Sequence, residues 1–149
     1  MTFKLYPSLT DVPAIQLYNI LKLRQDVFII EQDCIYNDID GKDDFSKHLL
    51  MMDDRRRLVA YLRMVPAGEK FEEWSLGRIV VDPVYRGNQH GKELIKKAVG
   101  LLQEKGVSKI RIEAQAHLED YYKALGFKPV SAIYSVDNIP HLQMLLKIV

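Results

Sequence analysis

The chain of 149 residues contains a single cysteine, Cys34, so an internal disulfide is excluded. It also lacks any apolar run close to the roughly 20 residues that a membrane-spanning helix requires. Residues 1–7 carry none of the long apolar stretch of a secretory signal peptide. These absences favour a cytoplasmic protein and argue against a membrane as its partner.

An excess of charge of one sign is missing as well. The chain has 21 Lys and Arg residues against 20 Asp and Glu residues, which gives a net charge of +1. Such a chain has no global field to attract a nucleic acid, and the basic run Arg55–Arg57 is too short to create one. The four histidines are not spaced like metal ligands. We therefore expect no nucleic-acid partner and no metal.

What the chain does have is enough apolar material for one core. Hydrophobic residues make up 48% of the sequence, and neither a repeat nor a linker divides it. We therefore expect a single domain over residues 1–149. Hydrophobic periodicity and turn residues predict a mixed α/β order, with the strands in one twisted sheet. Strands are expected at residues 3–6, 48–52, 58–65, 74–81, 109–114, 127–130 and 141–148, and helices at 91–103 and 118–125.

A further helix is expected near the start of the chain. Thr10 or Asp11 would cap it, Pro13 would lie in its first turn, and Leu17, Leu21 and Phe28 would share its buried face. The loop that follows, residues 32–46, holds five aspartates against one lysine. This loop is either an acidic mouth for a cationic ligand or simply a solvated segment.

The most informative segment is residues 78–92, RIVVDPVYRGNQHGK. An apolar strand and a turn lead into a short loop with Gly87 and Gly91, and an amphipathic helix follows. The first N–H groups of a helix have no intrahelical partner, and the helix dipole favours an anion there. Arg86 and Lys92 add positive charge, so this order of elements indicates a phosphate site, although the glycines taken alone would indicate only a turn.

The same segment resembles the acyl-CoA signature of the GNAT superfamily of N-acetyltransferases, Arg/Gln-x-x-Gly-x-Gly/Ala. Arg86 matches its first position and Gly91 its last, whereas Gln89 replaces the first signature glycine. If that position demands a positive φ, glutamine costs about 1–2 kcal/mol there. The later motif Tyr-x-x-x-Gly-Phe is met by Tyr122, Gly126 and Phe127. Residues 24–41, 114–118 and 139–141 resemble the ElaA-like branch, so the resemblance covers nearly the whole chain.

The resemblance implies a mixed, mostly antiparallel twisted sheet flanked by helices, with acetyl-CoA as co-substrate and a primary amine of a small molecule, peptide or protein as acceptor. Superfamily members are often homodimers, which makes a homodimer the assembly to test. The cofactor residues carried over are Ile79, Val80, Val81, Arg86, Gly87, Asn88, Gln89, His90, Gly91 and Lys92. The backbone N–H groups of Val80 and Val81 would polarise the thioester carbonyl.

Catalytic roles follow from the same resemblance. Tyr122 would protonate the leaving thiolate, with a packed aromatic as the alternative reading. The base that accepts the proton of the amine would be Glu31, His117 or His141, of which we favour Glu31. The alternative for Glu31 is a surface or ion-paired carboxylate. A competing hypothesis for the whole chain is a module that senses acyl-CoA without catalysis.

Overall fold

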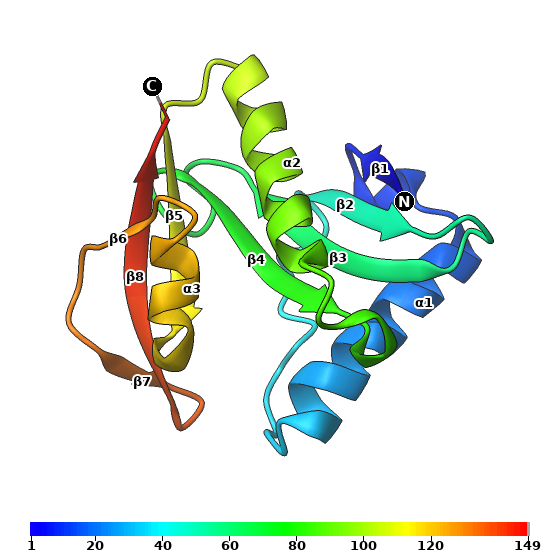
Figure 1. Cartoon of the computed structure of the whole chain (residues 1–149), viewed down its shortest axis with the longest axis horizontal. Helices are drawn as coiled ribbons and strands as arrows, with labels where there is room; N and C mark the ends of the chain where they lie inside the picture. The colour runs from blue at the N-terminus through cyan, green and yellow to red at the C-terminus, as the bar shows by residue number, and fades with distance from the viewer. Residues whose placement is uncertain (149) are drawn as a thin grey trace.

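The computed structural model describes residues 1–148, which form a single eight-stranded mixed sheet with helices on both faces (Figure 1). The strands lie in the order β1-β2-β3-β4-β5-β8-β6, and β7 pairs with β8. Their bounds are β1 Thr2–Tyr6, β2 Lys47–Met52, β3 Leu58–Val65, β4 Trp74–Val81, β5 Lys109–Gln115, β6 Lys128–Pro129, β7 Tyr134–Val136 and β8 Ile139–Lys147. The predicted sheet is therefore confirmed.

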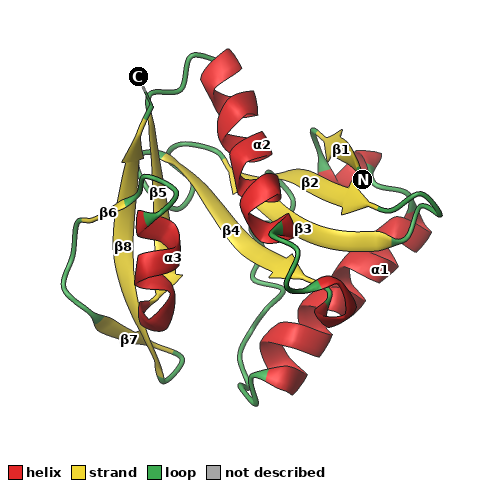
Figure 2. Cartoon of the chain, viewed as in Figure 1, coloured by secondary structure: helices red, strands yellow, loops and turns green. Residues whose placement is uncertain are grey.

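The helical segments are α1 Ala14–Arg24, α2 His90–Glu104 and α3 Glu119–Lys123 (Figure 2). Short 3-10 turns occur at η1 Leu9–Asp11, η3 Pro83–Tyr85 and η4 Ala116–Leu118. Helix α1 continues directly into a π-helical segment, η2 Gln25–Glu31. Segments of this kind are rare and occur frequently at functional sites.

One parallel contact, between β4 and β5, divides the sheet. All other neighbouring strands are antiparallel, and β4 meets β5 at only two residue pairs, Trp74 with Ile110 and Ser75 with Arg111. Beyond Ser75 the two strands diverge, as Figure 1 shows. The second half of β4 thus has a hydrogen-bonded neighbour on the β3 side only.

The core lies mainly on the face covered by α2 and α3. The predicted stripe of α2 is confirmed, because Leu94, Ile95, Ala98 and Leu102 are buried in it. Strand β5 contributes Ile110, Ile112 and Ala114 to this core and turns its alternate side chains, including Glu113 and Gln115, to the opposite face. On that opposite face α1 packs against β3 and β4.

The start of α1 differs from the prediction. Ser8, and neither Thr10 nor Asp11, caps the first turn, and that turn is the short η1. Pro13 is the N-cap residue of α1, which has no side-chain cap. Ile20, Leu23 and Val27 form the buried face, whereas the predicted Leu17, Leu21 and Phe28 are only partly buried. Within α1 the buried face is therefore centred on Ile20 and Leu23, and Val27 continues it into the π-helical segment that begins at Gln25.

The C-terminal strands also differ in extent. The predicted strand at 127–130 shrinks to β6, and the last strand begins earlier, at Ile139. Strand β7 was not predicted. It forms a hairpin with β8 through Asp137 and Asn138, whose φ angles are 49° and 64°. Two central residues with positive φ define the tight hairpin turn that Asp and Asn tolerate best, so this dipeptide was the available signal.

Three aspartates of the 32–46 loop form an ionic network with arginines that neither reading of this loop anticipated, while Asp33 and Asp44 are exposed. Asp38 and Asp43 accept hydrogen bonds from Arg24 at 2.8 and 2.9 Å. Asp40 accepts two from Arg63, at 2.7 and 2.8 Å. Arg24 is only 1% exposed, so Asp38 and Asp43 neutralise a buried guanidinium group, whereas Asp40 also lines the cavity described below.

Candidate functional site

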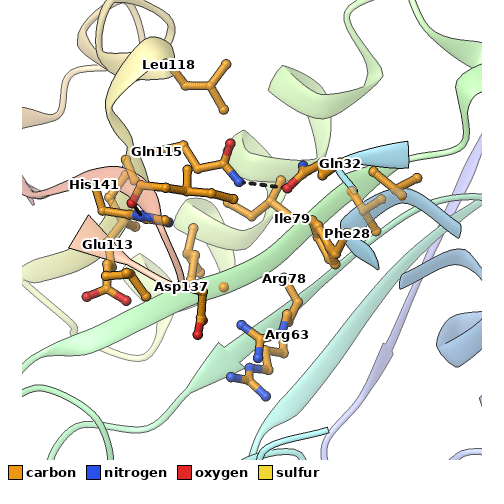
Figure 3. Close-up of a pocket in the computed structure, with 18 of the residues that line it drawn as sticks. Phe28, Gln32, Arg63, Arg78, Ile79, Glu113, Gln115, Leu118, Asp137 and His141 are labelled. Carbon is orange, nitrogen blue, oxygen red and sulfur yellow. Dashed lines mark hydrogen bonds between the residues drawn. The ribbon is translucent and has the colours of Figure 1, made fainter. Parts of the chain in front are cut away.

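A cavity of about 820 Å³ opens where β4 leaves β5. Its walls come from β3, β4, the second half of β5, η4 and α3, and from η2 with the loop after it and the hairpin of β7 and β8 (Figure 3). Fourteen residues were predicted for the site, counting His141 as an alternative base, and eight of them line this cavity: Ile79, Val80, Val81, Arg86, Gly91, His117, Tyr122 and His141. Tyr121 and Gln115, which were not predicted, line it as well.

The other residues predicted to bind the cofactor belong to the loop after Arg86 and to the start of α2. Gly87, Asn88, Gln89, His90 and Lys92 are outside the set that lines it. Gly87 and Gln89 both adopt positive φ, 87° and 61°. The strain considered for Gln89 is therefore present. This conformation keeps the loop in a tight turn that ends at the start of α2.

That turn leaves backbone donors free at the N-terminus of α2. The first hydrogen bond of the helix runs from the Glu93 N–H to the Gln89 carbonyl, at 3.1 Å. The N–H groups of His90, Gly91 and Lys92 precede it and have no carbonyl within the helix to accept them. At Gly91 a Cβ atom would lie 2.7 Å from the Tyr121 hydroxyl, so a larger residue would require the Tyr121 side chain to shift. The geometry suits a phosphate group.

Strand β4 supplies a second set of donors. Arg78 has a φ of 51° and marks an irregularity in the pairing with β3. The Asp82 N–H donates to the Val59 carbonyl of β3 at 2.8 Å. Because N–H groups alternate in direction along a strand, those of Ile79 and Val81 face the side that β5 has vacated. This alternation directs the Val80 N–H toward β3, away from the cleft.

Tyr122 lies at the cavity wall but is only 7% exposed. Its ring packs edge-on against Tyr121 and Phe127, with centroids 5.2 and 5.9 Å away. Burial raises the pKa of Tyr122 well above its usual value, so the phenol is protonated at neutral pH. The ring of Tyr122 is therefore packed, as the alternative reading expected. Tyr122 is at the same time one of the residues that line the cavity.

Two histidines, His141 of β8 and His117 of η4, also line the cavity. His141 Nδ1 lies 2.7 Å from the Ile139 carbonyl. A carbonyl only accepts, so Nδ1 carries the proton and Nε2 of the neutral ring keeps its lone pair. His141 pairs with Gln115 of β5 in the sheet register, which places both side chains on one face (Figure 3). His117 is exposed at the cavity rim.

Glu113 is a cavity residue that sequence reasoning missed. It accepts hydrogen bonds from Tyr134 at 2.6 Å and from Lys70 at 3.3 Å. Burial alone would raise the pKa of Glu113, but these two contacts lower it overall. The alternation of residues 109–114 placed Glu113 on the polar face of its strand and was the available signal.

Glu31, the favoured base in the sequence analysis, pairs with Arg86. Its two carboxylate oxygens accept hydrogen bonds from Arg86 at 2.6 and 2.8 Å. The bond from Arg86 lowers the pKa of Glu31, which weakens it as a base. Glu31 is also outside the set of residues that line the cavity. This geometry matches the ion-paired alternative and does not favour Glu31 as the catalytic base.

Residues 1–148 were searched for a metal site and for a membrane-spanning helix. Within them, no cluster of three or more His, Cys, Asp or Glu side chains is arranged to hold a metal ion. None of the helices in this range combines the length and the apolar character needed to cross a membrane.

Comparison with known sequences identifies the family of this chain. The model of the acetyltransferase (GNAT) domain matches residues 19–148, so the chain belongs to the GNAT family. It is 35% identical to the protein ElaA of Escherichia coli over 143 residues, which cover 94% of this chain and 93% of ElaA. The resemblance to the ElaA-like branch is thereby confirmed.

Solved structures extend the comparison. An acyl-CoA N-acyltransferase from Pseudomonas aeruginosa matches with a TM-score of 0.89 and 32% identity, over 97% of this chain and 98% of that one. E. coli ElaA matches with a TM-score of 0.87 and 32% identity, over 99% and 100%. An aminoglycoside 6'-N-acetyltransferase complexed with coenzyme A shares the fold, at a TM-score of 0.75 and 16% identity, over 100% and 98%.

Proposed function

We propose that this protein transfers the acetyl group of acetyl-CoA directly to a primary amine on a small molecule, a peptide or a protein. The observation that carries this proposal is the divergence of β4 from β5 beyond Ser75. It leaves the N–H groups of Ile79 and Val81 facing a cavity whose upper end is the N-terminus of α2. The pantetheine arm would lie between the strands, with the pyrophosphate on the loop 86–92.

The reaction begins with a neutral amine. A lysine-type amine has a pKa of about 10.4, so a base has to remove its proton. We assign this role to His141, whose Nε2 carries the free lone pair and whose tautomer is fixed by the Ile139 carbonyl. His117, the other histidine at the cavity, is exposed and has no such contact among the described residues.

The amine nitrogen then attacks the thioester carbonyl. The Val81 N–H, with that of Ile79, stabilises the oxyanion, and one such donor is worth about 2.7–4 kcal/mol. When the intermediate collapses, the carbonyl re-forms, the new C–N bond stays and the C–S bond breaks. Tyr122 gives its hydroxyl proton to the leaving sulfur, so coenzyme A departs as the thiol, and the tyrosinate takes up the remaining proton of the attacking nitrogen. The proton that His141 took from the ammonium group returns to water.

Replacing Tyr122 with phenylalanine tests this assignment. Tyr122→Phe keeps the aromatic packing against Tyr121 and Phe127 and removes only the hydroxyl. We expect acetyl-CoA affinity close to wild type and kcat lowered about 100-fold or more, since one positioned acid–base group contributes about 10²- to 10⁴-fold. Calorimetry gives the affinity, and thiol release with a panel of primary amines gives kcat.

Tyr121→Phe is the matched control, because Tyr121 precedes Tyr122 and also lines the cavity. It should keep kcat near wild type. An unchanged kcat in Tyr122→Phe would remove Tyr122 from the mechanism. Saturable binding of acetyl-CoA without thiol release from any amine would instead favour the non-catalytic sensor.

A further inference from the structure

Two neighbouring residues at the end of η2 contact both sides of the cleft. Glu31 receives two hydrogen bonds from Arg86, the first residue of the acyl-CoA signature. Gln32 accepts a hydrogen bond of 3.2 Å from Gln115, at the end of β5 (Figure 3). Residues 31 and 32 thus tie the cofactor loop after β4 to the strand that diverges from it.

The contact with Arg86 occupies the groups that a phosphate would use. Both terminal nitrogens of the guanidinium, Nη1 and Nη2, donate to Glu31 in a fork. Carboxylate and phosphate oxygens fit this fork in the same way, so the two ligands compete for one side of Arg86.

The ion pair of Arg86 and Glu31 is exposed, so a phosphate can replace the carboxylate. The side chains of Arg86 and Glu31 are 45% and 41% exposed, so water screens their attraction. A pyrophosphate brings more negative charge than one carboxylate. It also gains the free N–H groups at the start of α2, which Glu31 leaves without a partner. Both differences favour the phosphate once acyl-CoA is present.

We propose that Glu31 holds Arg86 in the unliganded protein and that the pyrophosphate of acyl-CoA displaces it. This inference rests on the proposed function for the identity of the ligand. The displacement releases the end of η2 from the cofactor loop, next to the Gln32–Gln115 bridge at the cavity. Glu31 is then a residue that regulates cofactor binding, and binding of acyl-CoA is coupled to the side of the cavity that receives the amine.

Glu31→Gln tests the exchange. The amide keeps the size of the side chain but loses the charge that competes for Arg86. We expect CoA to bind about two- to fivefold more tightly, since an exposed ion pair is worth only a small factor. Asp33→Asn is the matched control, because it removes the same charge two residues away from an exposed position, while the carboxylate that pairs with Arg86 is that of Glu31. Its CoA affinity should stay near wild type.

Making Glu31→Gln in an Arg86→Gln background shows whether Glu31 acts through its contact with Arg86 or only through its negative charge. Arg86→Gln alone should weaken CoA binding, and adding Glu31→Gln to it should bring no further gain. Calorimetric titration of the four proteins with CoA gives all the affinities. Weaker binding in Glu31→Gln, or an equal gain with and without Arg86, would overturn the exchange.

Steady-state kinetics separate this role from that of a base. If Glu31 regulates binding, Glu31→Gln keeps the kcat and its dependence on pH, whereas His141→Gln lowers kcat and loses the acidic limb of the profile. Loss of that limb in Glu31→Gln would make Glu31 the base.

If the wild-type protein bound no CoA at all, the proposed function would fail. If it bound CoA with an unchanged affinity in Glu31→Gln, only the exchange would fail.

Discussion

Gln89 occupies a backbone conformation that suits glycine better. Its φ of 61° lies in the left-handed region, at the N-cap of the helix whose first N–H groups face the proposed phosphate. The residue makes no side-chain cap, so nothing in its own contacts offsets the strain. The loop nevertheless keeps the turn that presents the N-terminus of α2, because Gly87 also takes a positive φ.

Gln89→Gly should therefore stabilise the protein. Relief of about 1–2 kcal/mol of left-handed strain is partly offset by the greater freedom of glycine in the unfolded chain, about 0.5–1 kcal/mol. We expect the free energy of unfolding to rise by up to about 1 kcal/mol, measured by denaturant titration. Asn88→Gly is the control, since Asn88 has no positive φ and should lose stability. A less stable Gln89→Gly protein would contradict the strain argument.

Sequence reasoning performed well for single residues that a motif fixes. Arg86, Gly91 and Tyr122 all lie at the cavity, as their motif positions predicted. It performed poorly for Glu31, because the partner of that carboxylate lies 55 residues away and no local pattern links the two. Glu113 was missed for the same reason, since Tyr134 and Lys70 reach it from distant segments.

At the level of elements, the buried ionic network joins the 32–46 loop to α1, β3 and β4. Asp43 accepts hydrogen bonds from Arg24 and Arg63, and all three side chains are nearly inaccessible to solvent. Asp40 and Asp38 also receive the guanidinium of Arg78, the residue at the irregularity of β4. The network thus fixes the strand whose backbone donors face the cavity.

Asp43→Asn should unfold far more easily than the wild type. Removing one partner of a buried pair leaves Arg24 and Arg63 without full compensation, which costs about 3–5 kcal/mol. Urea denaturation at neutral pH measures this loss. The adjacent Asp44→Asn is the matched control, because Asp44 is exposed and its change should stay within about 0.5 kcal/mol. Equal effects at the two positions would show that the network adds little stability.

The same pair of variants has a distinct pH dependence. Burial alone would raise the pKa of Asp43, but the hydrogen bond and charge of Arg24, with those of Arg63, lower it overall. A carboxyl whose folded pKa is lowered stabilises the fold above its unfolded pKa of about 3.9, and that contribution is lost as the pH falls below it. The stability difference between wild type and Asp43→Asn should therefore shrink in acid below about pH 4.

These ionic partners explain why the loop was misread. Local composition showed an excess of aspartates, which is normal for a solvated segment. The neutralising arginines, Arg24, Arg63 and Arg78, stand 14 to 40 positions from their partners in the chain. Only the packing of α1 across β3 and β4 brings them together, so periodicity predicted the elements but not their contacts.

On the scale of the whole molecule, the sheet consists of two antiparallel parts, β1 to β4 and β5 to β8. They are joined only where the first residues of β4 pair with β5. Antiparallel pairing and the core under α2 hold each half, and the order of strands and helices could be read from the sequence. The divergence after Ser75 could be inferred only from the family resemblance, because it depends on how two non-adjacent strands meet. The cavity therefore lies at the parallel junction between the two antiparallel parts of the sheet.

A ligand that fills this junction should stabilise the whole protein. Acetyl-CoA at about 100 times its Kd should add about 2.7 kcal/mol, which for a chain of this size raises Tm by about 5–10 °C. Thermal unfolding monitored by calorimetry gives this shift. Pantetheine, which lacks the pyrophosphate, is the control ligand and should give a smaller shift at the same concentration.

Amide hydrogen exchange locates the effect within the molecule. Bound acetyl-CoA should slow exchange at Ile79 and Val81, whose N–H groups face the vacated side of β4, and at the start of α2. Leu49 and Leu62, in the fully buried pair of β2 and β3, serve as internal controls that change little. A Tm shift without protection at Ile79 and Val81 would place the ligand elsewhere, and the divergence of β4 from β5 would then lose its role as the cofactor site.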